Sequence, residues 1–199
     1  MKALTFEYSI PRYLLTGALA NRMPRVLFSG LAPVQLREVP EPELPGPDWV
    51  KVRPRLAGLC GSDLSIIRCH ESLTLQPFAS YPFVLGHEVC GEIVELGADM
   101  EGFEAGERVS VMPFLACRER GIEPPCRLCA RGRKQLCENF TEGRFSPGMF
   151  EGSNADVPGF LSEMSVAPRH NLFKVPEKLS DENVVMVEPL ATCLHMVLA

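Results

Sequence analysis

Apolar and polar residues alternate in several short segments of this chain, which predicts β-strands. In residues 49–58, Val50 and Val52 alternate with Lys51 and Arg53, as expected of a half-buried strand. Turns rich in glycine, proline or asparagine separate such segments, a pattern typical of an antiparallel, barrel-like β domain. We therefore predict a mainly β fold, with further strands in residues 88–97, 106–114 and 160–168.

Three other stretches lack a clear alternation. Residues 1–38 alternate only loosely and carry no readable motif. Residues 39–47 contain four prolines, which predicts an extended connector because proline fixes φ and donates no hydrogen bond. Residues 141–159 are rich in turn-forming residues and weakly hydrophobic, so we predict a long surface loop.

The pattern becomes helical near the end of the chain. Ser180 is a suitable N-cap, and Asp181 and Glu182 fall in the first turn, where the helix dipole favours negative charge. Pro189 should break or restart the helix. Apolar residues remain helically spaced up to Ala199, which predicts a helix over residues 181–199 whose partner lies beyond it.

The composition is that of a soluble globular protein. Of the 199 residues, 46% are hydrophobic and 23% are charged. A net charge of −5 gives no electrostatic footprint for a nucleic-acid partner, and no apolar run has the length of a membrane span. Glu7, Pro11 and Arg12 interrupt the apolar segment that a secretion signal needs, so we expect a cytoplasmic protein.

Four of the eight cysteines lie in one short segment, CRERGIEPPCRLCARGRKQLC. A C-x2-C pair with two flanking cysteines can surround one ion, and four thiolates at about 2.3 Å from zinc leave no position open. The side chains of this segment carry six positive and two negative charges, which would offset the charge of the cluster. The pattern predicts a structural zinc lobe over residues 115–140, with the ligands Cys117, Cys126, Cys129 and Cys137.

Three other interpretations of these cysteines are weaker. Disulfide-stapled extracellular domains are usually far shorter and richer in cysteine. A redox function for Cys126 and Cys129 would require a βαβ context that the local pattern lacks. A basic surface loop with unrelated thiols would rarely place four of them at ligand spacing.

Two further short strings, GLCGSD and LGHEVCG, suggest a second metal site. Cys60 supplies a thiolate and His87 an imidazole, and each follows a glycine-containing turn at the end of a predicted strand. A catalytic zinc keeps three protein ligands and one open position. Asp63 is suited to hold the second nitrogen of the imidazole. Taken alone, Cys60 and His87 would be ordinary buried residues, and the predicted zinc lobe favours the functional interpretation.

Together these strings resemble the zinc-dependent medium-chain dehydrogenase/reductase family, in the branch that oxidises alcohols, polyols and sugars. The resemblance runs from about Val39 to the end of the chain. It implies a catalytic domain with a chaperonin-10-like (GroES-like) β-barrel and a linking helix. The residues that carry it are Cys60-Gly61-Ser62-Asp63, Gly86-His87-Glu88, the four cysteines, the string FLSEMSV and Glu188-Pro189-Leu190.

The resemblance implies roles for individual residues. Cys60 and His87 would bind a catalytic zinc, and either Glu88 or Glu188 would supply the third ligand or hold the water on the zinc. Ser62 stands where the family places the hydroxyl that takes the proton of the substrate. Since neighbouring strand residues point to opposite faces, His87 and Glu88 can share one ion only across a turn.

The implied activity is that of a dehydrogenase in which zinc polarises the oxygen of an alcohol, polyol or sugar for hydride transfer to NAD or NADP. No G-x-G-x-x-G string occurs, so we expect the cofactor-binding Rossmann domain to be absent. The chain then divides into a catalytic domain (residues 1–180) and a linking helix (residues 181–199), inactive without the missing domain. The sequence is compatible with a homo-oligomer. The alternative is a non-enzymatic zinc-binding barrel used for binding or assembly.

Overall fold

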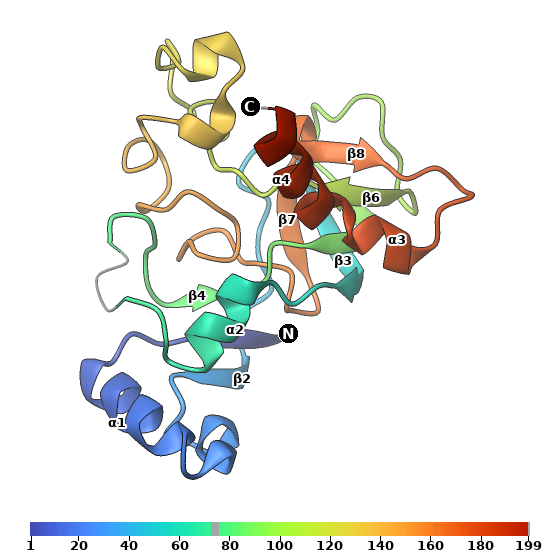
Figure 1. Ribbon diagram of the computed structural model, residues 1–199. Helices are drawn as coiled ribbons and strands as arrows, with labels where there is room; N and C mark the ends of the chain where they lie inside the picture. The colour runs from blue at the N-terminus through green and yellow to red at the C-terminus, as the bar shows by residue number, and fades with distance from the viewer. Residues whose placement is uncertain (73–75, 199) are drawn as a thin grey trace.

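The computed structural model describes residues 1–72 and 76–198, and every strand pair in this part of the chain is antiparallel (Figure 1). The strands are β1 (Lys2–Phe6), β2 (Val34–Glu38), β3 (Trp49–Ala57), β4 (Phe83–Val84), β5 (Val89–Leu96), β6 (Arg108–Val111), β7 (Ser165–Pro168) and β8 (Leu172–Lys174). The helices are α1 (Ile10–Ala20), α2 (Gly61–Ile67), α3 (Asp181–Val185) and α4 (Val187–Leu198), with 3-10 turns η1 (Pro24–Phe28), η2 (Cys129–Arg131), η3 (Lys134–Leu136) and η4 (Arg169–Asn171). The predicted mainly β fold is confirmed.

The larger sheet has the strand order β7-β3-β5-β6-β8, and it contains all four strands that the sequence predicts. Val50 and Val52 of β3 are fully buried, as their alternation indicated. Pro54 interrupts the same strand, where the register with β5 shifts between Pro54 and Leu56. A strand can contain proline at such an irregularity because no ladder hydrogen bond from its nitrogen is required.

The core of the larger sheet is mostly aliphatic and also includes Phe160, which lies outside its strands. Its buried members pack from neighbouring strands against one another, and removal of their apolar surface from water is the main stabilising contribution. They are Val50, Val52, Val89, Ile93, Val109, Val111, Phe160, Ala167 and Leu172. The segment that follows β3 and the segment that precedes β5 are therefore both anchored to the larger sheet.

The smaller sheet has the order β2-β1-β4 and comes mostly from residues in which the sequence showed no motif. It is tied to the rest of the barrel by backbone hydrogen bonds of Leu4 with Leu85 and Leu161. A second core lies beneath it and consists of Phe6, Tyr13, Val34, Ala79, Phe83 and Leu85, with Leu4, Ile66, Ile67, Cys69, Tyr81 and Leu161 packed against it. We call this set the second core.

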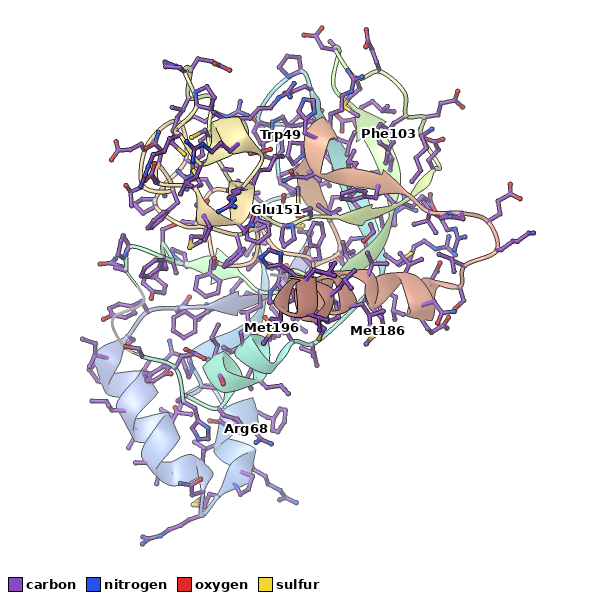
Figure 2. All side chains as sticks on the ribbon, turned by 45° about the horizontal axis from the view of Figure 1, so that its top comes forward. Trp49, Arg68, Phe103, Glu151, Met186 and Met196 are labelled. Carbon is purple, nitrogen blue, oxygen red and sulfur yellow. The ribbon has the colours of Figure 1, made fainter. Side chains whose placement is uncertain are left out.

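Residues 141–159 contain no helix or strand, as predicted, but they are not a surface loop. Glu151, Asn154 and Val157 are fully buried. Burial is possible because side chains satisfy the irregular backbone: the guanidinium of Arg120 donates to the carbonyl oxygens of Glu142, Phe145, Ser146 and Gly148. Figure 2 shows Glu151 where the four-cysteine lobe meets the barrel.

The C-terminal segment consists of two helices that meet at Met186. The hydroxyl of Ser180 accepts a hydrogen bond from the backbone N–H of Asn183, which confirms the predicted N-cap. Pro189 falls in the first turn of α4, so the helix restarts there as expected. Figure 1 shows α4 crossing in front of the larger sheet. Among the described residues, no helix is long and apolar enough to cross a membrane.

Candidate metal centres

Cys60 lies between the end of β3 and the start of α2. It occupies the N-cap position of α2, and its backbone N–H donates a 3.0 Å hydrogen bond to Oδ2 of Asp63. Just before it, the backbone N–H of Gly58 donates to the carbonyl of Glu88 at 3.0 Å. The start of α2 therefore places Cys60 and Asp63 beside the residues that precede β5.

His87 and Glu88 follow a left-handed turn at Gly86, where φ is +98°. A Cβ atom at Gly86 would overlap the backbone and side chain of Leu161, so both conformation and space require glycine. His87 and Glu88 precede β5, which begins at Val89. Because they lie outside the strand, its alternation does not separate their side chains.

These turns bring the side chains of Cys60, His87 and Glu88 together. One sulfur, one imidazole nitrogen and one carboxylate oxygen all lie within 4.8 Å of one another. Glu88 is buried, whereas Cys60 and His87 are half-buried. Burial raises the pKa of the Glu88 carboxyl above its ordinary value, and the charge of Glu188 raises it further. The set has the donor chemistry of a three-ligand zinc site with one side open.

Asp63 lies behind this cluster and is almost fully buried. Its Oδ1 stands 4.0 Å from Nδ1 of His87, which is ion-pair range but longer than a hydrogen bond. It also accepts hydrogen bonds from the backbone N–H groups of Cys60 and Gly86. Burial raises the pKa of Asp63, and the nearby imidazole and these two bonds oppose the rise. The predicted supporting carboxylate therefore lies beside the imidazole.

Glu188 and Ser62 lie near the cluster rather than in it. Glu188 is in the first turn of α4, where its carboxylate accepts a 3.3 Å hydrogen bond from Thr192. Ser62 is exposed on the first turn of α2. Of the two glutamates that the sequence left open, the structure brings Glu88 and not Glu188 into the three-residue group.

A cleft of about 640 Å³ runs between α4 and the larger sheet. Glu188 lines it, and the charge of Glu188 raises the pKa of Glu88, whereas Cys60, His87 and Glu88 are not among the residues that line the cleft. Its walls are largely apolar and carry three aromatic rings, those of Phe114, Phe150 and Phe173. Thr192 and His195 face it from α4. Such a cleft has the size of a small-molecule site.

The four cysteines of the lobe also converge. The sulfurs of Cys117, Cys126, Cys129 and Cys137 all lie within 4.8 Å of one another. Cys117 and Cys137 are buried with their sulfurs 3.6 Å apart, and the backbone N–H of Cys126 points to the sulfur of Cys117. The arrangement is closed, as a structural zinc site requires.

The backbone, more than the basic side chains, lowers the pKa of one of these thiols, that of Cys126. Partial burial raises the pKa of the Cys126 thiol, but hydrogen bonds from the backbone N–H groups of Glu138 and Cys129 outweigh it and lower the pKa to about 6. Several cations of the lobe are instead paired with acids: Arg127 with Glu138 at 2.8 Å, and Lys134 with the buried Glu119 at 2.7 Å. The basic side chains are thus not among the main causes of the low pKa of Cys126.

Sequence inspection missed one contributor to the first cluster. Gly58 packs against the carboxylate of Glu88 so closely that a Cβ atom would overlap it. The only sequence signal was its place two residues before Cys60 in the string GLCGSD. A glycine there became informative only when the fold placed it beside Glu88.

Comparison with known proteins gives a consistent assignment. Residues 46–177 match the sequence model of the alcohol dehydrogenase GroES-like domain. The chain is 32% identical over 166 residues to L-threonine 3-dehydrogenase of Serratia proteamaculans, which covers 83% of this chain and 43% of that enzyme. It therefore spans less than half the length of the curated relatives that it matches.

Solved structures agree with this match. The chain is similar to 2R,3R-butanediol dehydrogenase from Bacillus subtilis, with a TM-score of 0.70 and 25% identity over 100% of this chain and 47% of that one. It is similar to galactitol-1-phosphate dehydrogenase from Escherichia coli, with a TM-score of 0.68 and 26% identity over 98% and 44% of the two chains. A zinc-binding dehydrogenase from Sinorhizobium meliloti, solved with NADP, gives a TM-score of 0.66 and 30% identity over 86% and 43%.

Proposed function

Because the chain belongs to the family of the alcohol dehydrogenase GroES-like domain, we propose that it is the catalytic part of a zinc-dependent dehydrogenase that oxidises an alcohol, polyol or sugar with NAD or NADP. The observation that carries the proposal is the cluster of Cys60, His87 and Glu88, whose ligand atoms lie within 4.8 Å of one another. The relatives named above act on threonine, butanediol and galactitol phosphate, which are all small hydroxyl compounds.

The donor atoms of both clusters suit zinc. Cys60, His87 and Glu88 offer sulfur, nitrogen and oxygen, three ligands that leave a fourth position for a substrate oxygen. The four cysteines of the lobe offer only sulfur and leave none. When bound at the first cluster, zinc acts as a Lewis acid that acidifies the hydroxyl of the substrate. At the lobe, Cys117, Cys126, Cys129 and Cys137 would hold zinc and so be tied to one another.

The remaining residues of the first site have separate tasks in this proposal. Asp63 holds the imidazole of His87 in place through its negative charge, because it is buried and lies 4.0 Å from Nδ1. Ser62 is the second residue of α2 and is exposed, and it relays the proton of the substrate to solvent. Glu188 faces the cleft and accepts a hydrogen bond from a hydroxyl of the substrate.

The nicotinamide cofactor belongs to another part of the protein in this proposal. A dinucleotide site of the Rossmann type requires parallel strands and a glycine-rich turn. The sheets of residues 1–72 and 76–198 are antiparallel, and the sequence has no G-x-G-x-x-G string. The residues at hand therefore do not fit the cofactor.

Metal analysis tests the proposal on the chain itself. We expect two zinc ions per chain, one that exchanges with a mild chelator and one that resists it. Cys60→Ser should abolish the exchangeable ion and keep the other. Cys193→Ser, which removes an exposed thiol from α4, is the matched control and should retain both. A single tightly held zinc would instead support a non-enzymatic binding module.

In this proposal, activity requires a nucleotide-binding domain joined to this chain. We expect the protein that joins this chain to a nucleotide-binding domain to reduce NAD or NADP with at least one member of a panel of alcohols, polyols and sugars. Cys60→Ser should lower that rate by at least about 10³-fold, since the step depends on Lewis-acid activation. Equal turnover by wild type and Cys60→Ser would disprove the assignment.

A further inference from the structure

The connection between β1 and β2 is much longer than two neighbouring strands require. These strands pair up to Phe6 and Val34, so residues 7–33 form the whole connection. Antiparallel neighbours are usually joined by about two to five residues. This segment, here called the N-terminal excursion, contains α1 and η1 and lies outside the residues that match the family model. Figure 1 shows α1 beside α2, on the side away from the four-cysteine lobe.

The excursion inserts one side chain into the second core. Tyr13 is 6% exposed and meets the ring of Phe6 edge-on, with centroids 6.2 Å apart. Ile66 and Ile67, at the C-terminal end of α2, pack against the same core. Tyr13 therefore packs into the apolar cluster that receives α2.

Polar contacts fix Tyr13 and its helix in this position. The phenol of Tyr13 donates a 2.8 Å hydrogen bond to the carbonyl of Glu71, just beyond α2. Burial raises the pKa of Tyr13 to about 12. The buried hydroxyl of Thr16 donates to the carbonyl of Leu31 at 3.0 Å and holds α1 to the returning chain. Tyr8 stacks on Tyr81, with centroids 4.7 Å apart.

Both segments that carry the ligands of the first cluster are rooted in this second core. Cys60 is the N-cap of α2, and Ile66 and Ile67 of that helix pack against the core. Leu85, a fully buried member of the core, precedes His87 by two residues. A helix of seven residues has little stability of its own, so its position depends on this packing.

We propose that the N-terminal excursion positions the catalytic metal ligands, with Tyr13 as its positioning residue. By closing the second core over the C-terminal end of α2, α1 fixes the opposite end of that helix, from which Cys60 and Asp63 face His87. The role of the cluster rests on the proposed function, whereas the coupling of α1 to α2 does not.

Amide hydrogen exchange in the metal-free chain tests the coupling. The backbone N–H groups of Leu64 and Arg68 form the hydrogen bonds of α2, and that of Ile93 lies in the larger sheet. We expect Tyr13→Ala to speed exchange at Leu64 and Arg68 about tenfold more than at Ile93, because the opening is local. Tyr13→Phe keeps the ring and should give a smaller increase of the same kind.

Leu14→Ala is the matched control, since Leu14 neighbours Tyr13 on α1 but is 56% exposed. It should leave α2 exchange within about twofold of wild type. Equal acceleration at Leu64 and Ile93 in both Tyr13 variants would show a merely structural role and overturn the proposal. So would unchanged exchange in α2.

Cobalt binding tests the consequence for the ligands. We expect Tyr13→Ala to weaken Co²⁺ binding at the Cys60 cluster about tenfold, with affinity at the four-cysteine lobe unchanged. Loss of affinity at both sites, or at neither, would contradict positioning. If wild type fails to bind Co²⁺ at the Cys60 cluster while α2 exchange still responds to Tyr13, the coupling stands and the proposed dehydrogenase function is wrong.

Discussion

The carboxylate of Asp63 lies 4.0 Å from the imidazole of His87. It also accepts hydrogen bonds from the backbone N–H groups of Cys60 and Gly86, which belong to the two segments that carry the ligands. One buried side chain thus touches the start of α2, which carries Cys60, and the turn at Gly86, which carries His87. The spacing of the two ligands depends on this contact.

Asp63→Asn tests that contact with little change of shape. The amide oxygen can still accept the backbone bond from Cys60, but the negative charge beside His87 is lost. We expect zinc affinity at the first cluster to fall about tenfold, the lower end of what a supporting carboxylate contributes. Competition with a chromophoric chelator measures it. Unchanged affinity would show that the charge of Asp63 does not support the imidazole.

Removal of one lobe thiol should destabilise the fold as well as release a metal ion. Cys126→Ser takes away a ligand with a low pKa and leaves three sulfurs that cannot close the site. We expect the tightly held zinc to be lost and the free energy of unfolding to fall by about 4 kcal/mol, or roughly 10 °C in melting temperature. Calorimetry measures the change, with Cys193→Ser as control. A stable, zinc-replete Cys126→Ser protein would exclude the four-cysteine site.

The sequence predicted those parts of the fold whose side chains follow a local rule. Val50 and Val52 alternate because one face of β3 is buried, and the four cysteines of the lobe keep ligand spacing within one segment. Ser180 acts within its own helix turn. In each case the interaction partner lies nearby in the chain, so spacing alone was informative.

Elements stabilised by distant partners escaped prediction. Tyr13 and Thr16 look like scattered residues until the second core and Leu31 surround them. Residues 141–159 look solvent-exposed because their burial depends on Arg120, whose side chain satisfies their carbonyl groups. Likewise, the choice between Glu88 and Glu188 depended on how α4 lies against the barrel.

Gly58→Ala should disturb the first cluster through Glu88 alone. The added methyl group would overlap the Glu88 carboxylate, which must then move away from Cys60 and His87. We expect a loss of about tenfold or more in zinc affinity at that site, with lobe zinc retained. Gly30→Ala, where nothing lies within 4 Å, controls for the substitution itself. Equal affinities in the two variants would exclude Glu88 as a ligand.

The last prediction concerns acid stability at the start of α3. Hydrogen bonds from Arg55 and Arg108, at 2.8 and 2.6 Å, lower the pKa of Asp181 to about 2. A carboxylate whose pKa is lower in the folded than in the unfolded chain stabilises the fold above the unfolded value, and this contribution disappears as the pH falls toward the folded value. The sensitive window therefore lies between about pH 4 and pH 2.

Asp181→Asn should accordingly lower the free energy of unfolding by about 1 kcal/mol at pH 7, a figure that allows for solvent screening of the partly exposed arginines. The difference from wild type should shrink below pH 4 and be largely lost at pH 2, where Asp181 of the folded protein is becoming neutral like the asparagine. Urea unfolding at several pH values measures it, with the exposed Glu177→Gln as control. A difference that persists undiminished at pH 2 would mean that Asp181 stabilises α3 through its shape and not through its charge.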